Sequence, residues 1–132
     1  MPMNVALEGK TYTPVHFEVR EDHVRRFAEV VGDDGSSVPP TFVTAPEIEA
    51  GLDQVVADPE LGLDFARVVH GEQEFEWSRP VRVGDVLEVR STIESIRVKG
   101  GHEFLTLRTE MRDEAGALIV LARSLLIVWG GA

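Results

Sequence analysis

The chain has no cysteine among its 132 residues. This absence excludes a disulfide framework, a thiolate nucleophile and a thiolate metal site. The four histidines are scattered, without the spacing typical of metal ligands: His16, His23, His70 and His102. We therefore expect neither a metal nor a cofactor.

Basic residues are also scarce. Thirteen lysines and arginines stand against 23 aspartates and glutamates, which gives a net charge of −10 at pH 7. Nucleic acids and anionic membrane surfaces are bound through positive patches, so neither is expected as a main partner. Membrane-length apolar runs are missing, and the start of the chain lacks the pattern of a signal peptide. These features predict a cytoplasmic protein.

The residues that are present predict one domain spanning residues 1–132. An edge strand is expected around residues 11–19, followed by a short amphipathic helix that stops at Gly32. A longer helix is predicted near residues 41–57, with a wide apolar face. We place Glu47 and Glu49 off this face or at its margin.

From about residue 67 the pattern changes to the period-two alternation of strands, over residues 67–77, 86–98, 103–112 and 117–129. In the first of these strands we expect Gln73, Phe75 and Trp77 on one face and His70 on the other, with Glu72. Four long antiparallel strands have one face to cover, and one apolar helix is available to cover it. The pattern predicts an α+β fold with a curved antiparallel sheet around one long central helix.

Three segments resemble the MaoC-like family of (R)-hydratases and dehydratases. They are the Gly-Asp loop from Gly32, the Pro-Pro-Thr-Phe of residues 39–42, and HGEQEFEWSRPVRVGD over residues 70–85. Their order is similar to the N-terminal, fatty-acid-synthase-type dehydratase branch of that family. The resemblance implies a hot-dog fold, the form of sheet around a helix described above, and a ligand that is an acyl-CoA or acyl-carrier-protein thioester.

The chain departs from this family at its catalytic loop, which in relatives reads Gly-Asp-x-Asn-Pro-x-His. Asp33 matches the aspartate, but Gly35 stands in place of the asparagine and Val38 in place of the histidine. The loop before Pro39 is also shorter. Hydration needs one group for the water and another for the α-proton, so Asp33 lacks its partner. Asp33 is the candidate catalytic residue as a weak remnant, the alternative being a turn former or cap.

The candidate substrate-binding residues are Pro40, Thr41, Phe42, His70 and Gly71. The first three begin the central helix, whose free N–H groups suit a thioester carbonyl. The resemblance places the His-Gly pair near that helix start, and glycine allows close backbone approach. For His70 the alternative is a half-buried histidine bonded to the backbone.

Three functions follow as hypotheses. The first is a subunit of a (3R)-hydroxyacyl-thioester dehydratase or enoyl-thioester hydratase, inactive alone and paired with an intact MaoC-like subunit, as the resemblance implies. The second is a non-catalytic homodimer that binds acyl thioesters. The third is a hot-dog thioesterase using Glu47 or Glu49, although a solvated face or a dimer contact also explains these glutamates. An oligomer, with itself or with another chain, is expected because pairing sheets removes an exposed edge.

Overall fold

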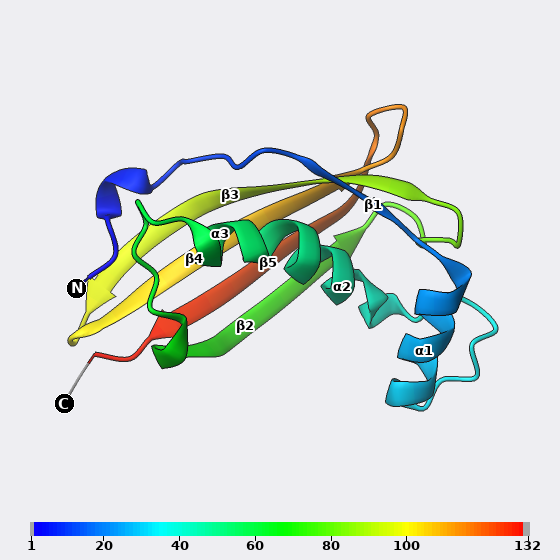
Figure 1. Ribbon diagram of the computed structural model, residues 1–132, viewed down its shortest axis with the longest axis horizontal. Coiled ribbons are helices and arrows are strands. Elements are labelled where there is room, and N and C mark those ends of the chain that lie inside the picture. The colour runs from blue at the N-terminus through cyan, green and yellow to red at the C-terminus, as the bar shows by residue number, and fades with distance from the viewer. Residues whose placement is uncertain (1, 131–132) are drawn as a thin grey trace.

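Five antiparallel strands form one sheet in the order β1-β3-β4-β5-β2 (Figure 1). The computed structural model describes residues 2–130. The strands are β1 (Val15–Glu18), β2 (Val68–Trp77), β3 (Val86–Lys99), β4 (His102–Arg112) and β5 (Leu118–Val128). β3, β4 and β5 follow one another as hairpins, while β2 and β1 lie at the two edges. The predicted α+β architecture is confirmed.

The first helix, α1 (Glu21–Val31), lies at one end of the sheet (Figure 1). It ends where the sequence predicted, because Gly32 adopts the left-handed conformation with φ 78° and donates its N–H to the carbonyls of Ala28 and Glu29. Short 3-10 turns occur at Val5–Leu7 (η1) and Phe65–Arg67 (η4). Among residues 2–130, no helix combines the length and apolar character needed to cross a membrane.

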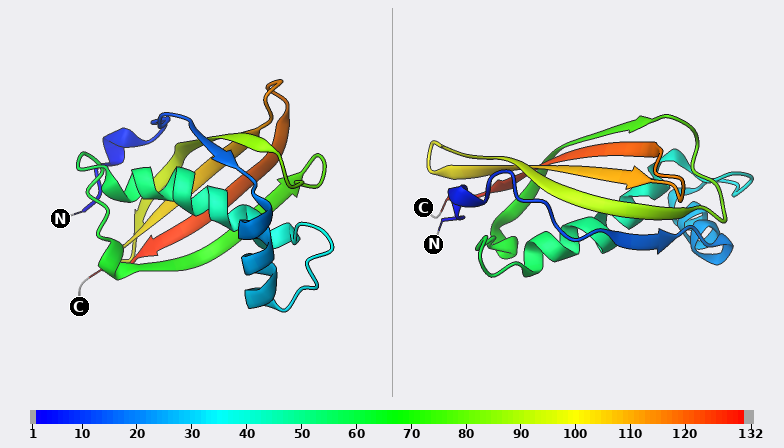
Figure 2. Two further views of the ribbon diagram at one scale, coloured as in Figure 1. Left: turned by 45° about the vertical axis from the view of Figure 1, so that its right-hand side comes forward. Right: turned by 90° about the horizontal axis from the view of Figure 1, so that it is seen from above.

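The central helix runs without interruption over residues 40–57 but changes type along its length. It begins as a 3-10 turn, η2 (Pro40–Val43), continues as α2 (Thr44–Pro46) and η3 (Glu47–Leu52), and ends as α3 (Asp53–Ala57). η3 is a π-helical turn, a rare form that often occurs at functional sites. The helix covers one face of the sheet, which Figure 2 shows edge-on in its right-hand view.

The helix is seated most tightly on the sheet at Gly51. A Cβ atom at this position would lie 2.5 Å from the Ser91 hydroxyl of β3. That hydroxyl is fully buried and forms a 2.9 Å hydrogen bond with the hydroxyl of Thr109 on β4. Only glycine permits this approach of helix and strands.

Two apolar clusters fill the space between helix and sheet. Phe42 lies in the first, which packs against the end of the sheet near α1, and Val55 lies in the second, near the N-terminal segment. Phe42 is fully buried and contacts the rings of Phe27 (centroids 5.5 Å apart) and His23 (5.0 Å) edge-on. Its ring thus anchors α1 to the central helix.

A β-bulge in β2 changes which side chains face the helix. The register against β5 shifts between His70 and Glu72, so that His70 pairs with Leu126 and Gln73 pairs with Ser124. Both partners are buried on the helix side of β5. The expectation that His70 faces away from Gln73 is therefore wrong, because the inserted residue, Gly71, reverses the alternation.

Candidate functional site

The loop at the matching aspartate forms a local turn on the surface. Asp33 is exposed, and its carboxylate accepts a 2.8 Å hydrogen bond from the backbone N–H of Gly35. Asp34 does the same with Ser36 at 2.9 Å, which lowers the pKa of the Asp34 carboxyl. These are the turn-forming hydrogen bonds of aspartate, so the geometry favours the structural alternative for Asp33.

A cavity of about 430 Å³ lies beside the start of the central helix; we call it the start cavity. It is lined by Val38, Pro39, Pro40, Val43, Trp77, Ser78, Arg79, Pro80 and Val81. Val38, at the position of the missing histidine, packs against the apolar core and offers no proton-transfer group. Pro40 is exposed and lines this cavity. Thr41 is also exposed but is not among the lining residues, and Phe42 is buried in the core. The Phe42 side chain thus packs inside the core and lines neither this cavity nor the one described below.

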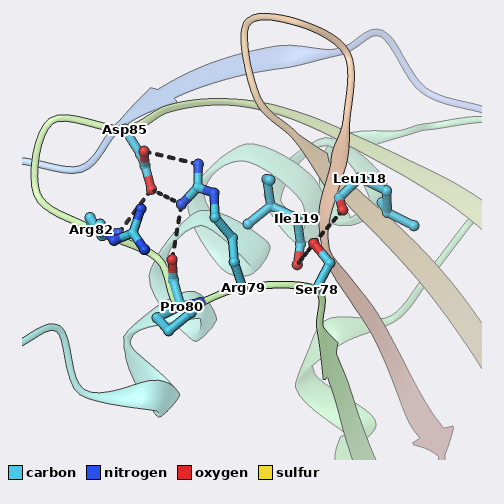
Figure 3. A network of polar contacts seen from close by, with 7 residues as sticks. All are labelled: Ser78, Arg79, Pro80, Arg82, Asp85, Leu118 and Ile119. Carbon is cyan, nitrogen blue, oxygen red and sulfur yellow. Dashed lines mark hydrogen bonds and ion pairs between the residues drawn. The ribbon is translucent and has the colours of Figure 1, made fainter.

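The turn after β2, which lines the start cavity, is held together by hydrogen bonds to one carboxylate (Figure 3). Arg79 donates two hydrogen bonds to the carboxylate of Asp85, at 2.8 and 3.1 Å, and the backbone N–H of Arg82 donates another at 2.8 Å. Burial opposes ionisation of Asp85, but these donors keep its pKa below the usual range. The Pro…Gly-Asp motif of residues 80–85 thus fixes the shape of the cavity wall.

A second cavity, of about 320 Å³, lies along the middle of the helix; we call it the middle cavity. Its polar lining residues are Thr44, Glu47, His70, Gln73, Thr109 and Ser124. Its apolar lining residues are Ile48, Leu52, Phe65, Val68, Leu107 and Leu126. A concave, largely apolar site with a few convergent polar groups is the usual form of a small-molecule site.

Glu47 is the acid of the middle cavity. It begins the π-helical turn, is only 6% exposed, and accepts a 2.9 Å hydrogen bond from the side-chain amide of Gln73. Burial raises the pKa of Glu47, while the Gln73 amide, the charge of His70 and the Ser124 hydroxyl oppose the rise. A carboxyl with a raised pKa in a cavity is a candidate functional group.

Glu47 lies on the buried face of the helix, not off this face or at its margin as expected from the sequence. It follows Val43 by four residues and precedes Ala50 by three, and both of these residues are buried. That spacing places all three on one helical face and was the available signal. Glu49, the other glutamate considered, is exposed.

The two residues of the His-Gly pair, His70 and Gly71, have different surroundings at the bulge. His70 lines the middle cavity together with Glu47. Gly71 is not among the lining residues, and a Cβ atom there would lie 2.9 Å from the Cδ1 of Ile127. The small size of Gly71 therefore serves packing against β5. The start and middle cavities have no lining residue in common. Of the expected substrate residues, Pro40 lines the first and His70 the second, while the other three line neither.

Comparison with known proteins places the chain in a family. The sequence profile described as "FAS1-like, dehydratase domain region" matches residues 31–122. The chain is 41% identical to the UPF0336 protein of Streptomyces coelicolor over 144 aligned positions, which cover 96% of this chain and 95% of that protein. It is 38% identical to the UPF0336 protein of Thermobifida fusca over 149 positions, covering 100% and 97%. Both alignments exceed 132 residues, so these relatives carry residues that this chain lacks.

Solved structures share the fold. A chain of the truncated HadBC (3R-hydroxyacyl-ACP dehydratase) complex from Mycobacterium tuberculosis superposes with a TM-score of 0.80 at 25% identity, over 92% of this chain and 96% of that one. A MaoC-like dehydratase gives 0.83 at 22% identity, over 96% of this chain and 43% of the other. Hot-dog dehydratases are thus its structural neighbours. With a profile match over most of its length and relatives similar from end to end, the chain belongs to the FAS1-like dehydratase domain family.

Proposed function

We propose that this protein is a non-catalytic subunit of a (3R)-hydroxyacyl-thioester dehydratase or enoyl-thioester hydratase. In this role it holds the acyl chain of a CoA or acyl-carrier-protein thioester, and a second hot-dog chain with the complete Asp and His pair performs the reaction. The observation that carries the proposal is a family fold that keeps a ligand-sized cavity along its helix but has Val38 in place of the histidine.

Loss of catalysis is supported by the chemistry of the loop. Adding water to an enoyl thioester requires a group that activates water and one that moves the α-proton. Asp33 is engaged in a surface turn, and Val38 packs against the core. Neither lines the middle cavity.

A partner chain is supported by the free edge of β2. This ten-residue strand pairs with β5 along one side, and no other strand of residues 2–130 pairs with its opposite side. Val69 and Trp77 are 42% and 41% exposed along it. A long, exposed edge without proline or lysine is a site where another strand can add.

The charges along β2 favour a different chain over a second copy. Glu72, Glu74 and Glu76 are all exposed on the sheet face opposite the helix. Residues directly opposite in an antiparallel pair share a face, and like charges in such positions are destabilising. Two copies paired through β2 would set one row of glutamates against the other. We therefore propose a partner whose edge strand carries lysine or arginine at the facing positions.

The test is a hydration assay with crotonyl-CoA. Typical enzymes turn over on the order of ten times per second, and the chain alone should be far slower than this. The same chain co-purified with the MaoC-like protein encoded nearest to it should give an active complex. Asp33→Ala should leave the rate of that complex unchanged, whereas alanine at the partner's catalytic aspartate should abolish it. Turnover by the chain alone that Asp33→Ala removes would refute the proposal.

A second candidate, thioester hydrolysis, is favoured by one observation: the buried Glu47 carboxyl faces a cavity and has a raised pKa. A carboxylate so placed could activate water for attack on the thioester carbonyl, releasing the thiol. Free-thiol release from octanoyl-CoA measures it directly. Release that Glu47→Gln abolishes and Glu49→Gln does not would establish hydrolysis. No release above the uncatalysed rate would remove this candidate.

A further inference from the structure

We propose that the sheet face opposite the central helix carries a docking groove for an acidic segment of another protein, in which carboxylates flank a large apolar side chain. We call it the outer groove. Its lining residues come from β3, β4 and β5, near the hairpin that joins β3 to β4 (Figure 1). It shares no residue with the start or middle cavity, so the proposal does not depend on the proposed function.

The outer groove lies on the uncovered surface of the sheet and has a volume of about 840 Å³. The strand register places Arg97 of β3 beside Phe104 of β4. The residues next to them in the chain, Ile96 and Leu105, point the other way and are buried in the apolar cluster around Val55 of the central helix. No helix of residues 2–130 lies over the outer face (Figure 2). The groove is therefore open to a partner.

The floor of the outer groove is apolar and contains one aromatic ring. Phe104, Leu125 and Val98 line it. The first two are half-buried, and Val98 is exposed. Protein interfaces are centred on such apolar groups, and a large side chain of the partner packs between them. The floor thus favours an occupant with an apolar anchor.

The charge of the outer groove is positive, although the chain as a whole has a net charge of −10. Within residues 2–130, every lysine and arginine forms an ion pair except Arg82, Arg97 and Lys99. The last two are exposed and line this groove, and no aspartate or glutamate is among its lining residues. Two neighbouring cations without a carboxylate favour an acidic occupant, because complementary charges select and orient a partner.

The polar groups around the outer groove support the same sign of charge. Glu94 is next to the groove in the chain, but its carboxylate already pairs with Arg123 at 3.2 Å and with Arg108 at 3.8 Å. Ser95 and Thr106 line the groove with hydroxyls, which can donate hydrogen bonds to a carboxylate. Carboxylates of an incoming segment would therefore find both cations and hydroxyl donors.

A protein segment fits the outer groove better than a nucleic acid or an anionic membrane. Both of these present many phosphates and are bound by several lysines and arginines together. The same sheet face carries the glutamate row of β2 at residues 72, 74 and 76, which would repel a long polyanion. A short acidic segment needs only the two cations. The partner proposed for the edge of β2 has a basic strand there, so the acidic segment is a different one.

The experiment selects peptides from a random library displayed on phage, with the wild-type chain as bait. Peptides that also bind a folded double variant, Arg97→Gln with Lys99→Gln, are removed. The remaining peptides should share two or more acidic residues around leucine, phenylalanine or tryptophan. In fluorescence anisotropy, a selected peptide should bind the double variant about two- to thirtyfold more weakly than the wild type, the loss expected for two exposed ion pairs.

Two further variants test the floor and the specificity of the charge effect. Phe104→Ala, checked for folding by circular dichroism, should weaken the selected peptide about tenfold through loss of the ring. The matched control, Arg25→Gln with Arg26→Gln, removes two exposed arginines of α1 and should leave the affinity unchanged.

Several results would overturn the proposal. They are a selection that retains no peptide, a shared pattern without acidic residues, and equal weakening by the α1 control. Full affinity in folded Phe104→Ala would also overturn it, because the anchor would then not lie on this floor. Binding of single-stranded DNA or phosphatidylserine vesicles through Arg97 and Lys99, with no acidic peptide bound, would assign the groove to a different anion.

Discussion

Asp58 joins the segment before β1 to the end of the central helix through a single carboxylate. It accepts 2.7 Å hydrogen bonds from the Lys10 ammonium and from the Tyr12 hydroxyl, and its side chain is 6% exposed. The hydrogen bond from Lys10 leads the causes that lower its pKa to about 2, against the burial that opposes ionisation. The stabilisation that ionised Asp58 gives the fold is therefore fully present at a pH above 3.8, the ordinary pKa of aspartate. It is lost as the pH falls through about 2.

From this shift we predict that Asp58→Asn lowers the free energy of unfolding at pH 7 by about 1–2 kcal/mol. The variant should also lose less stability than the wild type between pH 4 and pH 2, a window set by these pKa values. Urea denaturation across that range measures both effects. Parallel acid profiles for the two proteins would contradict the assignment.

Glu47 has the opposite effect from Asp58 on how folding stability depends on pH. Its pKa is raised by burial, so the folded state keeps a proton that the unfolded chain has already released, and stability falls as the pH rises above the ordinary carboxyl value of 4.5. Glu47→Gln keeps the shape and can still accept from Gln73. We predict that it raises the free energy of unfolding at pH 7 by about 0.5–2 kcal/mol, with a smaller gain at pH 5. A loss of stability at pH 7 would show that the ionised carboxyl supports the fold.

At the scale of elements, the packing of the central helix on β3 and β4 depends on Gly51. Gly51→Ala places a methyl group against the Ser91 hydroxyl, which cannot move without weakening its hydrogen bond to Thr109. We predict a loss of about 1–3 kcal/mol in unfolding free energy, the usual cost of overpacking. Ser91→Ala combined with Gly51→Ala should cost less than the sum of the single changes, because Ser91→Ala removes the hydroxyl that the new methyl group would meet. Additive losses in urea denaturation would contradict the close approach.

The elements also show what the sequence could and could not reveal. Hydrophobic periodicity predicted the strands, α1 and the central helix, because each keeps its period over many residues. The bulge at Gly71 and the π-turn from Glu47 were missed, since one extra residue shifts the phase without changing the composition. These two irregularities place His70 and Glu47 in one cavity. The candidate site was therefore predicted only in part, from motifs rather than from periodicity.

At the scale of the whole molecule, the net charge of −10 and the glutamate row on β2 act together against self-association. Copies paired through β2 would place the Cβ atoms of opposed glutamates about 5 Å apart across the strands. This distance is shorter than the Debye length of about 10 Å at 0.1 M salt but longer than the roughly 3 Å at 1 M. Any self-association of the wild type through β2 should therefore strengthen as salt is added.

A charge-reversed copy of the chain can serve as the basic-edged partner. We predict that wild type mixed with a variant carrying Glu72→Lys, Glu74→Lys and Glu76→Lys forms a mixed dimer in 0.1 M salt. Each opposed pair of unlike charges contributes about 0.2–1 kcal/mol, so three pairs should favour the mixed dimer by about threefold to 150-fold over the wild-type dimer. Sedimentation and native mass spectrometry distinguish the species, because the exchanged residues change the mass. A control variant with lysine at the exposed Glu21, Glu29 and Glu114 has the same net charge and should not pair. Equal pairing by the control, or a tight wild-type dimer insensitive to salt, would show that β2 does not select its partner by charge.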